Sequence, residues 1–172
     1  PTKPNPGPPA PIPTPPHTPG APRDPPRMNL VPKEKPRPTR LSTTAREARW
    51  LGIPELGPGK RHGANGEAIP KYVEAHRYSI VREYCGHGIG EVFHEDPQVL
   101  HYGKRGTGME LREGMTLTVE PMVNAGKAGV RLLPDGWTVV TRDRSLSAQW
   151  EHTCQVTADG FEVLTLGADD RP

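Results

Sequence analysis

The chain has 172 residues, 23 of them proline, and its 22 lysines and arginines almost balance 20 aspartates and glutamates, giving a net charge of +2. No apolar run is long enough for a membrane span or a signal-peptide core, which argues against a membrane-spanning or secreted protein and favours the cytoplasm. With only two cysteines, a disulfide-rich scaffold and a cysteine-rich structural zinc site are also excluded.

Residues 1–40 are expected to be a disordered tail ahead of one folded domain at 41–168, with a short C-terminal tail at 169–172. Sixteen of the 23 prolines precede Arg40, and proline removes backbone donors and fixes φ. The same segment holds seven lysines and arginines against two acids. A basic tail suits contact with nucleic acid, but the composition is more typical of a solvated segment without a partner.

Two helices are expected first in the folded domain. The stretch "LSTTAREARWLGIPEL" offers Thr43 or Thr44 as the N-cap of a short helix that Pro54 ends. A second helix is expected over residues 65–76, because apolar residues recur there on one face. Pro70 must lie in its first turn or kink it.

Strands are expected after the helices. Alternation and β-branched residues predict strands over residues 78–84 and 115–123. Two hairpins are expected, with turns at Pro134-Asp135-Gly136 and Ala158-Asp159-Gly160. Helices followed by antiparallel strands indicate the α+β class.

One stretch, "EYCGHGIGEVFHEDPQVLHYG", gathers the histidines His87, His94 and His101 with the acids Glu95 and Asp96. It has the residue types of a metal site, but its carboxylates sit beside a histidine rather than opposite one. Glu95 and Asp96 are expected to orient their loop through local hydrogen bonds. His101 is expected to be structural or to lie on the surface.

Two glutamates further along the chain lie among residues typical of strands: Glu120 in "LTVEPMV" and Glu151 in "AQWEHTCQV". A carboxylate is costly to bury there unless it pairs or binds a cation. Together with His87, they form an oxygen-rich ligand set suited to Mn²⁺, Fe²⁺, Co²⁺ or Zn²⁺. On spacing alone, surface glutamates and a loop histidine remain the simpler alternative.

The motifs "CGHGIG", "FHEDPQVLHYG", "GMTLTVEPMVNAG" and "LLPDGWTVVTRDRSLSAQWEHT" together resemble type I methionine aminopeptidase, in order and spacing, from about Leu56 to Thr165. The resemblance implies the C-terminal part of the pita-bread fold of peptidase family M24. Prolidases and aminopeptidase P share that fold, but the contexts "QWEHT" and "VEPMVNAG" favour the methionine-specific branch.

The resemblance assigns metal roles to three residues. His87 would be a ligand, and Glu120 would be a ligand that also serves as acid and base for the attacking water. Glu151 would be a carboxylate that bridges two ions. The family uses two divalent ions of Co, Mn, Fe or Zn.

The resemblance also implies contacts with the substrate. His94 would hydrogen-bond the scissile amide or the tetrahedral intermediate, and Phe93 and Trp137 would help wall the pocket for the methionine side chain. The implied activity is metal-dependent removal of the N-terminal methionine from nascent proteins in the cytoplasm, with the ribosome as a further partner.

The family's upstream half also supplies two aspartates and a further histidine. In this sequence Asp24 is the one aspartate before His87, so at most one divalent ion is expected here. Two interpretations follow. Either the chain is a member of the family whose N-terminal half is missing or replaced, for example through an error in the gene model, or it is a non-catalytic truncated module that binds peptides or the ribosome.

Overall fold

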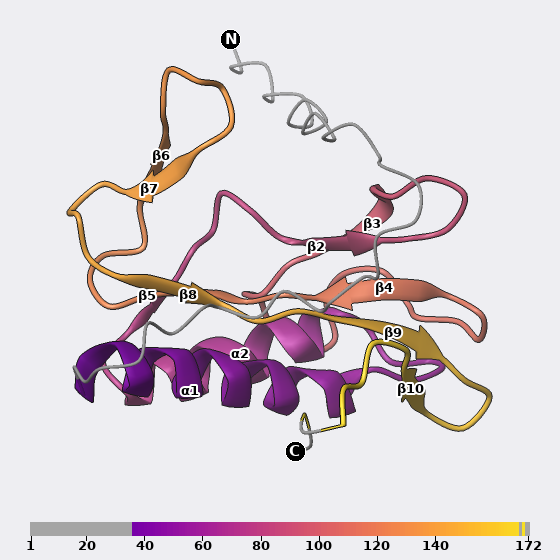
Figure 1. Cartoon of the computed structure of the whole chain (residues 1–172). Helices are drawn as coiled ribbons and strands as arrows, with labels where there is room; N and C mark the ends of the chain where they lie inside the picture. The colour runs from indigo at the N-terminus through magenta and orange to yellow at the C-terminus, as the bar shows by residue number, and fades with distance from the viewer. Residues whose placement is uncertain (1–35, 169, 171–172) are drawn as a thin grey trace, which may run out of the picture.

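The computed structural model describes residues 36–168 and residue 170. Two helices lie side by side along one face of a set of antiparallel strands (Figure 1). The helical elements are α1 (Pro36–Gly52), the short 3₁₀ helix η1 (Ile53–Glu55) and α2 (Gly63–Ala75). Within the described residues, none of the helices combines the length and the apolar character that crossing a membrane requires.

Helix α1 begins at Pro36, so the expected start at Thr43 or Thr44 was wrong. Proline is accepted in the first turn of a helix, where its missing N–H would have no partner in any case. Residues 36–40 therefore belong to this helix, while residues 1–35 of the expected tail lie outside the described residues.

Helix α2 confirms the second expected helix and includes Pro70 in its interior. Its residues Ile69 and Val73, four positions apart, are fully buried against the rest of the core. Helix α1 contributes Leu41, Ala45 and Ala48 to the same core. Both helices are thus amphipathic, with one face against the sheets.

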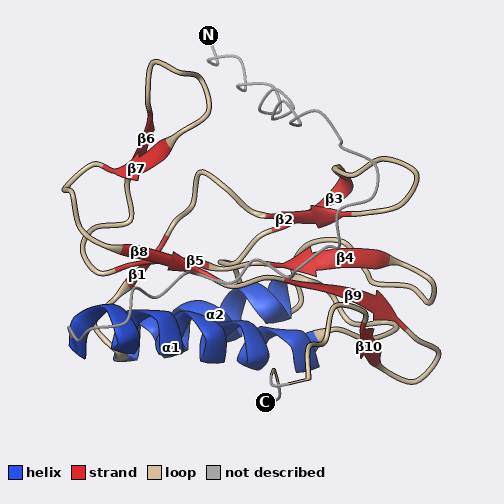
Figure 2. Ribbon diagram, viewed as in Figure 1, coloured by secondary structure: helices blue, strands red, loops and turns tan. Residues whose placement is uncertain are grey.

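The strands are short and all pairings are antiparallel (Figure 2). They are β1 (Ser79–Ile80), β2 (Gly86–Gly88), β3 (Glu95–Val99), β4 (Thr116–Val119), β5 (Met122–Asn124), β6 (Val130–Leu132), β7 (Val139–Thr141), β8 (Ser147–Gln149), β9 (His152–Val156) and β10 (Phe161–Val163). Among the described residues they form a sheet ordered β1-β5-β8, a sheet ordered β10-β9-β4-β2-β3, and the hairpin β6-β7. The α+β class is confirmed.

Both expected hairpins are present, as β6-β7 and β9-β10. The expected strand over 115–123, however, is interrupted at Glu120-Pro121, which divides it into β4 and β5. A second interruption of the strand structure, at Trp150-Glu151, separates β8 from β9. Proline lacks the N–H that a ladder would need, so it favours an interruption at this point. Strands β2 and β3 were not expected from the sequence.

The two breaks lie opposite each other. Strand β4 pairs with β9 as far as Val119 and His152, and β5 then pairs with β8 in the same register. Glu120 therefore faces Glu151 across the gap where the chain leaves one sheet and enters the other. This crossing point is the feature of the fold that positions the site.

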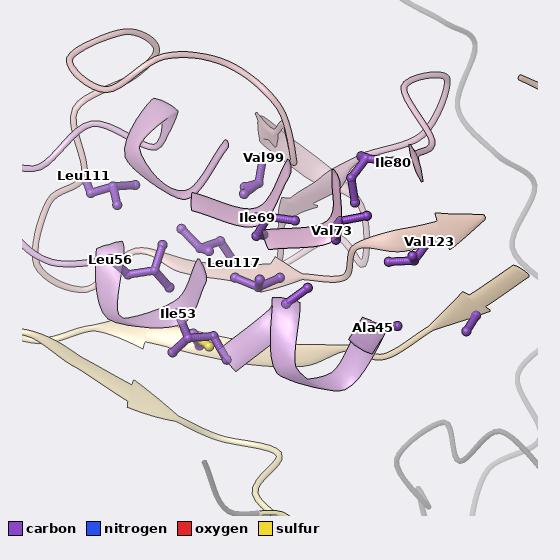
Figure 3. Packing of buried hydrophobic residues seen from close by; sticks show 14 of the residues in the cluster. Ala45, Ile53, Leu56, Ile69, Val73, Ile80, Val99, Leu111, Leu117 and Val123 are labelled. Atoms are coloured by element: carbon purple, nitrogen blue, oxygen red, sulfur yellow. The ribbon is translucent and has the colours of Figure 1, made fainter. Parts of the chain in front are cut away.

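The core lies between the helices and the strands (Figure 3). Ala45 and Ile53 from the helical layer and Leu117 and Val123 from the strands are at most 1% exposed. Burying the larger of these side chains, Ile53, Leu117 and Val123, contributes about 1.5–3 kcal/mol each. The site is thus built on strands that the core holds in place.

Candidate metal centre

Three residues that are far apart in the sequence converge in the structure: His87 in β2, Glu120 after β4 and Glu151 before β9. One ligand atom from each lies within 4.8 Å of the other two. The convergence follows from the sheet order, since β2, β4 and β9 are consecutive neighbours. The structure thus brings together the set that the sequence singled out.

The two carboxylates would repel each other in the absence of a cation. Glu120 and Glu151 lie opposite each other on neighbouring strand segments, and like charges in directly opposite positions destabilise a sheet. Burial raises the pKa of Glu120 to about 8, and the charge of Glu151 adds to the effect. Burial also raises the pKa of Glu151. A divalent cation between them would remove this repulsion.

The His87 ring is oriented to present Nε2 to the carboxylates. Its Nδ1 lies 2.8 Å from the carbonyl oxygen of Gly88, to which the Nδ1–H group donates a hydrogen bond. In the neutral ring with this tautomer, Nε2 carries the lone pair, 3.5 Å from Oε1 of Glu120. An unprotonated imidazole nitrogen held by a hydrogen bond on its other nitrogen is the usual arrangement of a metal-bound histidine.

The Glu120 carboxylate is held on both oxygens. The Thr118 hydroxyl donates to Oε1 at 2.8 Å, and the Gln149 amide donates to Oε2 at 2.9 Å. Sequence reasoning missed both donors. Thr118 and Gln149 each lie two residues before a ligand glutamate, so the period of two that governs strand faces could have pointed to them.

His101 also supports Glu120, through the backbone. The Glu120 N–H donates to His101 Nε2 at 3.0 Å. His101 is buried, and burial lowers its pKa to about 3, which keeps the ring neutral and able to accept. The histidine is therefore structural, as expected, and its contact is with a ligand residue.

His94 and Phe93 lie beside the ligands on the segment between β2 and β3. The His94 ring centroid is 4.3 Å from that of His87, and the Phe93 ring is 4.6 Å from His94. Burial, together with His87, lowers the pKa of His94, while Glu151 acts in the opposite direction. Phe93 is 43% exposed, so the pair borders the centre from its open side.

Trp137 lies apart from this group. It is 55% exposed at the turn of the β6-β7 hairpin, which projects from the rest of the fold (Figure 1). None of the aromatic contacts found among the described residues joins it to His94 or Phe93. Its expected place in a substrate pocket stays a prediction.

The ligand set fits a divalent transition metal. Ligand atoms at about 2.0–2.2 Å from a shared ion lie roughly 3–4 Å from one another, close to the separation of His87 Nε2 and Glu120 Oε1. One imidazole and two carboxylates suit Mn²⁺, Fe²⁺, Co²⁺ or Zn²⁺. The set would provide three protein ligands, so an ion bound there would have coordination positions left for water or a substrate oxygen.

Comparison with known proteins agrees with this geometry. Residues 24–158 match the model of metallopeptidase family M24. Methionine aminopeptidase from Escherichia coli K12 is 56% identical over 131 residues, which are 76% of this chain and 50% of the relative. The chain thus spans about half the length of the curated relatives it matches.

Solved structures show the same relationship. The crystal structure of methionine aminopeptidase from Rickettsia prowazekii superposes with a TM-score of 0.74 at 55% identity, covering 76% of this chain and 53% of that one. The methionine aminopeptidase from Thermotoga maritima gives a TM-score of 0.75 at 43% identity, covering 77% and 53%. Both have the fold found here.

Proposed function

The chain belongs to metallopeptidase family M24 and is homologous to its bacterial methionine aminopeptidases, and from this premise we propose that its metal centre serves the removal of N-terminal methionine from polypeptides. The observation that carries the proposal is the convergence of His87, Glu120 and Glu151 within 4.8 Å. Nascent polypeptides are the proposed substrates, which puts the reaction in the cytoplasm. Nothing in the described residues supports the ribosomal partner.

Three residues would hold a divalent ion: His87 through Nε2, and Glu120 and Glu151 through their carboxylates. Such an ion supplies Lewis-acid chemistry, polarising a peptide carbonyl and making a water more acidic. The hydrogen bonds from Thr118 and Gln149 keep the Glu120 carboxylate oriented toward the centre. Pre-orientation of this kind lowers the cost of reaching the reactive geometry.

Glu120 is also the proposed proton carrier. A general base works best when its pKa lies near the operating pH, and burial raises the pKa of this carboxyl to about 8. His94, beside His87, would donate a hydrogen bond to the scissile amide. Phe93 offers an apolar surface next to it, suited to an uncharged thioether side chain.

Turnover by the 172-residue chain alone is a separate matter. Among the described residues, one cluster of potential ligands is found, and it contains three groups. We therefore propose that this chain binds a single divalent ion and releases no methionine by itself. A second ion, and the ligands for it, would have to come from elsewhere.

Calorimetric titration with Co²⁺ tests the centre. We expect one ion per chain, with affinity reduced at least tenfold in Glu120→Gln and in Glu151→Gln, because each loses a charged ligand. The exposed Glu113→Gln is the matched control and should bind like the wild type. Equal affinity in all four proteins would show that Co²⁺ binds elsewhere.

Peptide binding tests the substrate class. The Co²⁺-loaded chain should bind Met-Ala-Ser, followed by tryptophan fluorescence, and should bind Lys-Ala-Ser and N-acetylated Met-Ala-Ser much more weakly. Equal binding of the lysine peptide would contradict a methionine pocket. Release of methionine that disappears in Glu120→Gln would support the chemistry but overturn the expectation that the chain alone is inactive.

A further inference from the structure

We propose that Arg49 and Asp170 are positioning residues for Glu151. The buried Arg49 forms an ion pair with the partly buried Asp170, which joins helix α1 to the C-terminal segment and fixes the main chain at the break between β8 and β9. This inference rests on the proposed function of the metal centre. It assigns a role at that centre to two residues outside the strands that carry the ligands.

The break leaves backbone groups without partners from a neighbouring strand. Glu120 and Glu151 lie opposite each other in the gap, and Pro121 has no N–H to offer. Side chains make the backbone hydrogen bonds that a paired strand would otherwise supply here. His101 accepts from the Glu120 N–H at 3.0 Å, and Arg49 Nη1 donates to the Glu151 carbonyl oxygen at 3.1 Å.

The guanidinium of Arg49 is held at both of its terminal nitrogens, whereas its buried Nε has no hydrogen-bond partner among the described residues. The side chain is 1% exposed, and its Nη2 donates to Oδ1 of Asp170 at 2.7 Å. Its Cζ lies 5.1 Å from the centroid of the Trp50 ring and 5.7 Å from that of Trp150, within the range of cation–π attraction. Because one planar guanidinium donates to both Asp170 and Glu151, the position of Asp170 fixes that of the Glu151 carbonyl.

Asp170 also lies beside His152, the residue that follows Glu151. Its Oδ2 lies 3.0 Å from His152 Nε2, and its Oδ1 accepts from the Trp50 indole N–H at 3.4 Å. The His152 ring packs edge-on against Trp50, with centroids 5.0 Å apart. The main chain of Glu151 is thus held at its own carbonyl and at the following side chain.

A positioning role explains this cluster better than stability does. A buried ion pair adds little net stability over apolar residues of the same size, because both charges must lose water. Partners that orient metal ligands, in contrast, typically change metal affinity 10- to 100-fold. Glu151 faces a like charge on Glu120, so a loosened main chain would let its carboxylate turn away from the centre.

The double variant Arg49→Met with Asp170→Asn separates the two roles in the full 172-residue chain. Removing both charges leaves no unpaired buried ion, so most of the stability lost in Arg49→Met should return in urea unfolding. Co²⁺ affinity measured by calorimetry should stay about tenfold below wild type, because the Glu151 carbonyl still lacks its donor. Arg105→Met, which breaks the exposed pair with Glu55, is the matched control and should leave affinity unchanged.

Two further measurements make the result independent of stability. Arg49→Lys keeps the charge but cannot bond Asp170 and Glu151 with one planar group, so it should retain stability and recover only part of the affinity. Hydrogen exchange of the peptide covering 147–153 should be faster in the stability-restored double variant than in the wild type, with or without Co²⁺.

Wild-type Co²⁺ affinity in the double variant, or unchanged exchange at 147–153 in that variant, would overturn the positioning role and leave the pair purely structural. If the wild type binds no Co²⁺, the proposed function of the centre fails. Exchange at 147–153 then still decides the inference: faster exchange in the double variant supports it, and equal exchange overturns it.

Discussion

Glu120 has its carboxylate and its backbone N–H held by three different side chains. Thr118 and Gln149 donate to the two oxygens, and His101 accepts from the N–H. The two donors lower the pKa of a carboxyl whose pKa burial raises, and they restrict the rotation of the carboxylate. The three contacts keep it directed at His87 and Glu151, so the centre is arranged before any ion arrives.

The His101 contact gives a prediction at the scale of a single residue. His101→Leu should lower the free energy of unfolding by about 2 kcal/mol, because the buried Glu120 N–H loses its acceptor. Urea unfolding followed by circular dichroism measures the change. His101→Gln carries an amide oxygen that can accept, and it should recover part of the loss. A leucine variant as stable as the wild type would contradict the assigned role of His101.

Strands β2 and β4 approach so closely that they leave no room for a side chain between them. A Cβ on Gly86 would collide with the backbone oxygen of Thr118. Gly86 lies beside His87, whose N–H donates to the Thr118 hydroxyl at 2.9 Å. The close contact of these two elements therefore sets the position of the imidazole.

Gly86→Ala should destabilise the chain by about 1–3 kcal/mol, because the added methyl group must push the two strands apart. It should also weaken Co²⁺ binding, since His87 moves with β2. Gly160→Ala is the control, because nothing lies within 4 Å of a Cβ there. Thermal unfolding and calorimetry measure the two effects. Unchanged stability of Gly86→Ala would contradict this, because it would mean that β2 can move away from β4 with no loss in the free energy of unfolding.

Asp143 fastens the connection between β5 and β6 to the segment that follows β7. Its Oδ2 accepts from the Lys127 N–H at 2.7 Å, and its Oδ1 accepts from the Ser145 N–H at 3.0 Å. The backbone N–H of Lys127 is the main cause that lowers the pKa of this carboxyl from 3.8 to about 2. The charged form is therefore the one that holds the two segments together.

A pH dependence follows from this shift. Because the folded pKa lies below the unfolded value, the contribution of Asp143 is present above about pH 4 and is lost as the pH falls toward 2. Asp143→Asn should therefore be less stable than the wild type at pH 5, with the difference shrinking as the pH decreases. Urea unfolding at several pH values, with Glu113→Gln as control, checks this. A difference that stayed constant with pH would exclude the carboxylate charge as the cause.

At the level of elements, local signals predicted the second helix and both hairpins correctly. Apolar residues at helical spacing marked α2, and Pro134-Asp135-Gly136 marked the β6-β7 turn. The breaks at Glu120 and Glu151 could not be predicted in this way, because they arise where paired strands pass from one sheet to another. Side chains alternate between the two faces in the same way on both sides of such a crossing, so the alternation in the sequence does not mark where it lies.

The candidate site, like the fold, could be predicted only in part from the sequence. The candidate ligands His87, Glu120 and Glu151 were predicted from the sequence through a family resemblance, whereas their supporting contacts were not. His101 and Gln149 lie 19 and 29 residues from the glutamate they hold. Those distances are closed only by the tertiary register of the strands, which no local pattern encodes.

Over the whole molecule, an ion at the proposed metal centre would tie three neighbouring strands into one unit. An ion that binds the folded chain and not the unfolded one stabilises it by mass action. At a free Co²⁺ concentration 100 times its dissociation constant, the gain should be about 2.7 kcal/mol, and chelation should reverse it. Thermal unfolding with and without Co²⁺ measures this. The double variant Glu120→Gln with Glu151→Gln should gain nothing, and an equal gain in it would place the ion elsewhere.

The shared register of the two broken strands also limits which changes in chain length the protein can tolerate. Glu120 faces Glu151 because β4 pairs with β9 and β5 pairs with β8 in the same register, with equal numbers of residues on both sides of the gap. Deleting one residue within either broken strand would turn a glutamate to the opposite face of the sheet and separate the ligands. The β6-β7 turn lies outside these paired segments, so insertions there would leave the glutamates facing each other. The chain is thus free to vary in length along one hairpin and confined to a fixed length along the strands that flank the centre.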